Sequence, residues 1–118
     1  MNINLTPHPC VVFDAAGVSE VARIAPSGQV ARVKTTAIEA GQVVEAGIKI
    51  PVVSTTYGNV EGLAEPKDGM IYIVSILVVT ALRMQGVNRP DVIAPDTGPD
   101  SVVRDQDGKI VGVRRFTR

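Results

Sequence analysis

The side chains best suited to holding an anion lie at turns of the sequence and in its last third. Ser75 precedes an apolar run, and a helix starting there would direct unpaired N–H groups and a positive dipole end toward a phosphate or carboxylate. The turn sequence Pro26-Ser27-Gly28 can present further backbone N–H groups. Arginines gather after Ser75, and arginine holds such groups through two parallel hydrogen bonds. We therefore predict a ligand-binding site drawn from Thr6, His8, Ser27, Gly28, Ser75, Arg89, Asp91, Asp96, Arg104 and Arg114.

The sequence contains few candidate catalytic residues. His8 is the only histidine, so a Ser–His pair would combine it with Ser75, and Asp14, Asp91 or Asp96 would orient the ring. The nucleophile motif G-x-S-x-G is absent around Ser75. A single histidine between two prolines is more often a structural hydrogen-bonding residue. The sequence therefore favours binding without turnover, and we assign no catalytic residue.

Metal and cofactor sites have equally little support. The single cysteine, Cys10, excludes an internal disulfide and a cysteine metal cage. Asp105 and Asp107 form a D-x-D pair, but it lies in a turn sequence and matches no calcium loop. We expect no metal ligand and no cofactor.

Each candidate residue also has a structural interpretation. Ser75 is a good helix N-cap, because its hydroxyl can accept a hydrogen bond from the first turn. The aspartates after residue 90 are common turn residues. The arginines can pair with these aspartates. The sequence leaves both interpretations open.

Composition narrows the class of protein. The chain has 118 residues, which predicts a single domain over residues 1–118. Twelve basic residues balance twelve acidic ones, which argues against bulk binding of nucleic acid or anionic membranes. An aromatic content of 3% leaves little to stack on bases. No signal peptide is recognised at the start, so we expect a cytoplasmic protein.

One helix is expected. Residues 71–74 are β-branched and aromatic, which indicates a strand that turns into a buried helix over about residues 75–86. Gly86 and Pro90 are stop signals, and the apolar run is shorter than the roughly 20 residues that a membrane span needs. A helix that is apolar all round needs a sheet on one side and other cover, such as a second subunit, on the other.

The remaining segments read as short strands and turns. Turn signals lie at residues 39–42, 45–47 and 57–59, Pro51 indicates an edge strand or bulge, and residues 89–100 read as a loop. Asp107-Gly108 between two β-rich runs predicts a hairpin. The expected fold is α+β and mostly β, either a small antiparallel barrel or a two-layer sheet with one helix. The expected strands cover residues 2–5, 10–14, 18–24, 29–35, 48–56, 71–74, 102–104 and 109–116.

Short motifs along nearly the whole chain resemble small proteins of bacteriophages and prophages that open with I-N-L-T-P-H. They are INLTPH at 3–8, PSG at 26–28, VARV at 30–33, GNVEGL at 58–63, IYIVS at 71–75, RPDV at 89–92, PD at 95–96, VRD at 103–105 and GKIVGVR at 108–114. The resemblance implies a phage protein acting in a bacterial cytoplasm, where such proteins include virion-associated and counter-defence factors.

Three functions follow as expectations. The first is an accessory protein that binds an anionic, nucleotide-like small molecule without turnover, working as a homo-oligomer with sites at subunit interfaces. The second is an inhibitor that binds a host defence protein through an exposed patch. The third is a small hydrolase using His8 with Ser75 or an aspartate.

Overall fold

A βαβ unit forms the centre of the molecule. The computed structural model describes residues 1–118, and in it strand β6 (Ile71–Ile73) leads through helix α1 (Ile76–Met84) into strand β7 (Val92–Pro95). Strands β6 and β7 are parallel, which requires a crossover such as α1. Two outer strands complete this first sheet in the order β1-β6-β7-β10, namely β1 (Asn2–Asn4) and β10 (Phe116–Thr117).

Helix α1 confirms the prediction of a single helix near residues 75–86. Ser75 is its N-cap in extended conformation, and Gly86 follows with a positive φ of 71°. One side is buried through Val78, Val79, Ala81 and Leu82. The other side exposes apolar side chains, so the helix is covered on one side only. These exposed side chains are Ile76, Leu77 and Met84. No helix in the structure has the length and apolar character needed to span a membrane.

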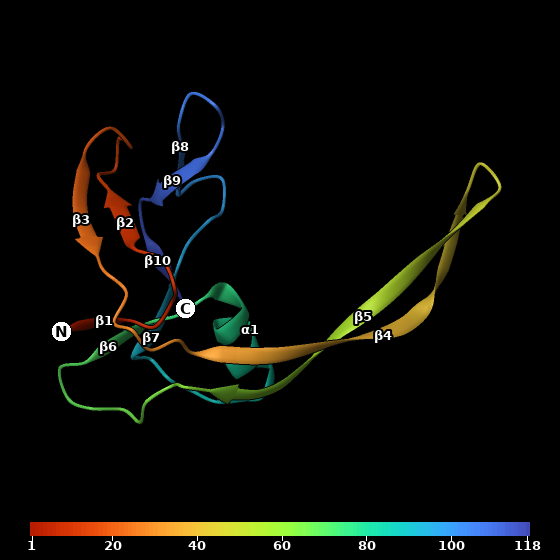
Figure 1. The fold of residues 1–118 in the computed structure, drawn as a ribbon, viewed down its shortest axis with the longest axis horizontal. Helices are drawn as coiled ribbons and strands as arrows, with labels where there is room; N and C mark the ends of the chain where they lie inside the picture. Colours follow the sequence, from red (N-terminus) through yellow and green to blue (C-terminus); the bar gives the residue numbers. More distant parts are fainter.

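A second sheet lies beside the first (Figure 1). Its strand order is β3-β2-β9-β8, and the β8–β9 pair is the hairpin predicted at Asp107-Gly108. Gly108 has a φ of 82°, which a residue with a side chain adopts at a cost. The bounds are β2 (Cys10–Phe13), β3 (Glu20–Ile24), β8 (Val102–Arg104) and β9 (Ile110–Val113).

A long two-stranded ribbon extends away from both sheets (Figure 1). It consists of β4 (Arg32–Glu45) and β5 (Ile48–Glu61), and we call it the arm and the rest of the chain the body. The radius of gyration is 17.1 Å, whereas a compact chain of this length has roughly 13–14 Å. The arm accounts for this difference.

The core lies between the first sheet, α1 and the base of the arm. Nine buried residues form it, and Val33 and Val60 of the arm pack against them. Only 16 of 118 residues are buried in total, so the body is held together by a small core. The nine are Leu5, Ala31, Tyr72, Val74, Val78, Val79, Leu82, Val92 and Ala94.

The mostly-β, α+β class is confirmed, with open sheets in place of a closed barrel. Antiparallel pairing is less general than expected, since β1–β6, β6–β7 and β2–β9 are parallel. The predicted turn at residues 39–42 is wrong: β4 continues through it with a bulge. Likewise β5 passes through residues 57–59, and residues 89–100 contain strand β7.

Candidate functional site

The arm owes its form to β-branched residues on both sides of one tight turn. Ala46 and Gly47 at the tip both have positive φ, 50° and 79°, which is the backbone of the turn that best matches strand twist. Gly41, at φ 110°, lies in the bulge of β4. Every residue from 34 to 56 is exposed. The arm therefore has no cover over most of its length.

The strand register sorts the arm's side chains into two faces. Residues directly opposite each other share a face, and alternate residues of one strand share a face. Val43 lies opposite Ile50, Ile38 opposite Ser54, and Glu45 opposite Ile48. Because β5 is regular from 48 to 57, its even-numbered residues lie on the same face as these partners. Five large aliphatic side chains, 39–65% exposed, thus share what we call the apolar arm face: Ile38, Val43, Ile48, Ile50 and Val52.

The opposite face of the arm has a different role. At the base it carries Val33 and Val60, which pack against the core of the body. Farther out it carries Glu39 and Lys49 among polar residues and two more exposed valines. One face thus anchors the arm to the body, and the apolar arm face has no partner within the chain.

The edges of the arm are poor sites for a further strand. Pro51 lies in β5 and lacks a backbone N–H, which interrupts any ladder along that edge. The bulge between Glu39 and Gln42 distorts the β4 edge. Docking on the arm is therefore expected through its faces.

Two of the predicted ligand residues meet at the base of the arm. Thr6 and Ser75 line one groove of about 260 Å³ together with Arg32 and Leu77. Arg32, the first residue of β4, lies opposite Glu61 and forms no ion pair. The Ser75 hydroxyl makes no capping hydrogen bond. The N-terminus of α1 and the unpaired guanidinium of Arg32 therefore line the same groove.

The N-terminal turn is organised by a residue that sequence reasoning missed. Asn4 is 1% exposed, and its amide donates to the carbonyls of His8 and Ile24 at 2.8 and 2.9 Å. Its Oδ1 accepts from the backbone N–H of Thr6 at 3.0 Å and from Thr6 Oγ1 at 2.7 Å. Thr6 is therefore tied into a structural network as well as lining the groove.

The other predicted residues of this region are placed differently. Ser27 donates its backbone N–H to the carbonyl of Asn4, and its hydroxyl lies 3.3 Å from the backbone of Gln29. Gly28 has a φ of 96° in an exposed turn. His8 lines a different groove, to which Thr6, Cys10 and Thr97 also contribute. None of the three lines the groove of Thr6 and Ser75.

Arg89 and Asp91 form a two-bond ion pair. Arg89 Nε and Nη2 lie 2.9 Å from Asp91 Oδ1 and Oδ2, and Nη2 also donates to the Ala64 carbonyl at 2.8 Å. The side chains are about 14% and 15% exposed. The hydrogen bond from Arg89 lowers the pKa of Asp91, and burial acts in the opposite sense. The Arg89 guanidinium therefore already uses its hydrogen bonds on Asp91 and on the Ala64 carbonyl.

The late charged residues are also engaged within the body. Arg115 donates to Asp96 at 2.6 Å and lowers the pKa of that carboxyl. Arg104 donates to the carbonyl of Gly108 in its own hairpin at 2.7 Å. Arg114 donates to the carbonyl of Val102 and packs against Gly17. These residues lie in different parts of the body and do not converge on Ser75.

No catalytic pair is assembled. The His8 side chain forms no hydrogen bond with Ser75 or with an aspartate, and no three His, Cys, Asp or Glu side chains gather as a metal site would. The carboxylate of Asp14 accepts from the N–H groups of Val18 and Ser19. Burial raises the pKa of Cys10, which keeps that thiol protonated.

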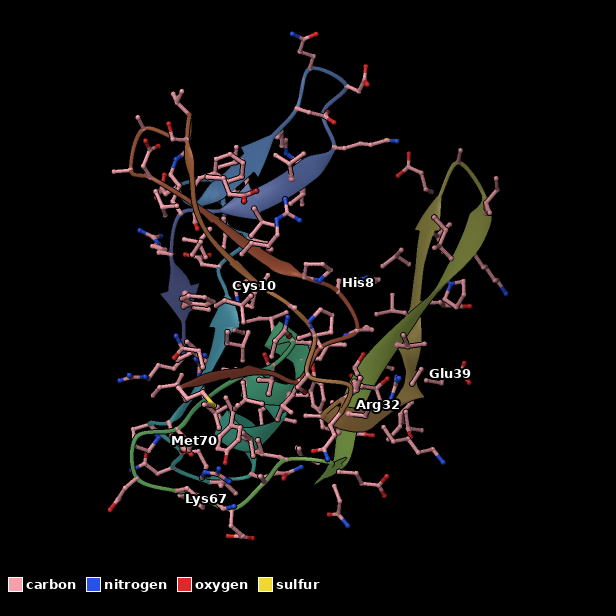
Figure 2. The ribbon with its side chains drawn as sticks, turned by 60° about the vertical axis from the view of Figure 1, so that its left-hand side comes forward. His8, Cys10, Arg32, Glu39, Lys67 and Met70 are labelled. Carbon is pink, nitrogen blue, oxygen red and sulfur yellow. The ribbon has the colours of Figure 1, made fainter.

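Sequence reasoning missed the arm and Arg32 as well as Asn4. The turn predicted at residues 45–47 is confirmed as the tip of the arm, but the sequence does not predict that the two strands continue through residues 39–42 and 57–59. Figure 2 shows Arg32 near the base of the arm and Glu39 farther out. Of the ten predicted ligand residues, Thr6 and Ser75 line the groove at the base of the arm, and the exposed arm is a second candidate surface.

No protein-family model, no curated protein and no solved structure matches this chain.

Proposed function

We propose that this chain is a non-catalytic accessory protein, of the bacteriophage kind that its motifs resemble, and that it acts by binding another protein through the apolar arm face. The observation that carries the proposal is the gathering of five exposed aliphatic side chains on one face of a solvent-surrounded ribbon. Contiguous exposed apolar surface is a mark of protein interaction sites. A two-stranded ribbon is only marginally stable alone, so a partner would also stabilise the arm.

The free energy available from burying the apolar arm face limits the strength of the complex. Full burial of an aliphatic side chain stabilises by roughly 1.5–3 kcal/mol, and these five are already about half buried. Covering all five would contribute about 4–7 kcal/mol, which is comparable with the lower estimates of the cost of association. Charged groups around the face must therefore add to the binding, and the complex is reversible.

Lysine cross-linking tests this proposal, because the arm carries Lys34 and Lys49. In bacterial cells that produce the protein, both lysines should cross-link to a second polypeptide. A variant with Ile38, Val43, Ile50 and Val52 changed to threonine should lose these cross-links and keep those of Lys67 and Lys109 in the body. Arm lysines that cross-link only within their own chain would refute the proposal.

A second function is supported by the groove of Thr6, Arg32 and Ser75. It brings a helix N-terminus and an unpaired guanidinium together, the combination expected for an anionic, nucleotide-like ligand held without turnover. Calorimetric titration with linear and cyclic nucleotides tests it. Binding should be lost in Arg32→Ala and kept in Arg104→Ala, since Arg104 only holds its own hairpin. Equal affinity in both variants would exclude this groove.

A further inference from the structure

We infer that the partner on the apolar arm face is a second copy of this chain, with the two arms antiparallel about a two-fold axis. The inference rests on the proposed function and names its partner. It follows from the order in which charged and aliphatic residues occur along this one face.

The apolar arm face has opposite charges at its two ends. Glu45 lies on this face at the tip, opposite Ile48. Lys34 lies on the same face at the base, since Thr35 and Val33 point to the other side and a glycine, Gly58, lies beside it. Neither side chain forms an ion pair within the chain. Ile48 lies beside Glu45, and the other four aliphatic side chains lie between Glu45 and Lys34.

This order is self-complementary in one orientation only. Two arms stacked in parallel would place Glu45 against Glu45 and Lys34 against Lys34, and like charges oppose association. Two antiparallel arms place each Glu45 opposite the partner copy's Lys34. This is an isologous contact, which closes after two copies and leaves the bodies at opposite ends.

The same register brings apolar side chains together. With Glu45 opposite Lys34, the two-fold axis passes close to Val52 and Ile38, so these residues of the two copies meet at the centre. Val43 and Ile50 then face Thr36 and Thr56, whose methyl groups extend the apolar contact. Two sheet faces pack about 10 Å apart with strands inclined by about 30°, which suits two twisted ribbons.

The size of the face indicates the strength of the dimer. Fourteen residues per strand give an arm about 45 Å long, and two strands with their side chains are about 10 Å wide. Two such faces cover about 900 Å² in all, slightly below the smallest standard interfaces of about 1,200 Å². A reversible dimer with a Kd of about 1 µM or weaker is expected.

Sedimentation velocity of the purified full-length chain, from about 1 µM to about 300 µM, brackets that range. The chain should shift from monomer to dimer with concentration. Val52→Glu should weaken the dimer at least about tenfold, because it places like charges across the axis. Val44→Glu is the matched control: Val44 is 62% exposed on the other face of the arm, opposite Lys49, and its change should leave the dimer intact.

A charge exchange tests the antiparallel register directly. Lys34→Glu and Glu45→Lys should each weaken the dimer about fivefold, because each breaks two exposed pairs. The double variant should recover the wild-type Kd within about twofold. Within one arm these residues lie roughly 35 Å apart along the strand, so recovery can come only from contact between copies.

The outcomes separate this inference from the proposal on which it rests. A monomer at every concentration, a dimer weakened equally by Val52→Glu and Val44→Glu, or no recovery in the double variant would each overturn the antiparallel dimer. The proposed function fails instead if the arm lysines cross-link to no second chain. Cross-links from Lys34 to a different protein, beside a monomeric purified chain, would retain the proposed function and reject the dimer.

Discussion

Replacement of Asn4 by alanine should destabilise the body more than any exposed substitution. Asn4 joins β1 to the N-terminal turn and to the end of β3 through four hydrogen bonds made by a buried amide. In Asn4→Ala the carbonyl of Ile24 and the N–H of Thr6 lose this partner, and the carbonyl of His8 keeps only the Thr6 hydroxyl. The fold near the groove depends on these bonds.

The expected loss can be estimated from these contacts. A hydrogen bond contributes about 1 kcal/mol net, and a polar group left unsatisfied in a partly buried place costs about 1–3 kcal/mol. Two groups left unsatisfied and two further lost hydrogen bonds, those of the His8 carbonyl and the Thr6 hydroxyl with Asn4, give a loss of about 3–4 kcal/mol in the free energy of unfolding. For a chain of 118 residues, each kcal/mol lowers Tm by about 4 °C, so Tm should fall by roughly 12–16 °C.

Urea denaturation and scanning calorimetry of the two variants measure this loss. Asn2→Ala is the matched control, because Asn2 is the same residue type on the same strand, is exposed and makes no side-chain hydrogen bond. Its free energy of unfolding should change by less than about 0.5 kcal/mol. A loss below about 1 kcal/mol in Asn4→Ala would refute the reasoning, since the network would then be replaced by water at little cost.

Three further predictions concern the body. Gly62→Ala should destabilise by at least about 1 kcal/mol more than Gly28→Ala in urea denaturation, because both glycines have positive φ but only at Gly62 would an added Cβ clash with a backbone oxygen, that of Val30. Equal losses in the two variants would contradict this clash. The Arg89–Asp91 pair should stabilise the fold at pH values above the ordinary aspartate pKa of 3.8, and this stabilisation should be lost as the pH falls through the lower pKa of Asp91 in the folded state. In thermal melts, the Tm of Asp91→Asn should therefore fall less steeply with decreasing pH than the Tm of the wild type. Parallel pH profiles of Tm would exclude this contribution of the pair. Ser75→Ala should lower the free energy of unfolding by less than about 0.5 kcal/mol, because the Ser75 hydroxyl makes no capping hydrogen bond, whereas loss of an N-cap usually costs about 1 kcal/mol. A loss of about 1 kcal/mol, measured by denaturation, would show that the capping bond forms.

Local signals predicted the helix and the last hairpin well. The signals for the helix are local in the sequence: an N-cap at Ser75, helix-forming residues after it and a stop at Gly86. Helix α1 begins and ends where these signals indicate. Asp107-Gly108 is a similar local signal, and β8 and β9 pair around it.

The arm could not be read in this way. Gly41 looks the same in sequence whether it makes a turn or a bulge, and the difference depends on whether β5 continues to pair beyond it. Strand β7 could not be predicted from the local sequence for a similar reason. Prolines and aspartates surround Val92, Ile93 and Ala94, yet pairing with β6 and β10 makes them a strand. Pairing with a distant segment outweighed the local preference.

The candidate site was predictable only in part. Thr6 and Ser75 lie in one groove because β1 and β6 pair in parallel, a contact that no short window of sequence contains. Arg32 lies outside the last third of the chain, where most of the arginines gather, so its position in the sequence does not indicate the groove. Those arginines were already bound by nearby partners, as Arg89 is by Asp91.

The paired ends of the arm have a consequence for folding kinetics. Arg32 and Glu61 lie opposite each other, so the chain leaves and re-enters the body at one point. Asn4 must find Ile73, about 70 positions away, and a zipped hairpin takes about 30 of those positions out of the loop to be closed. The saving in loop entropy is only about 0.5 kcal/mol, or roughly a twofold change in closure rate. The length of the arm can therefore change between related chains with little effect on how fast the body folds.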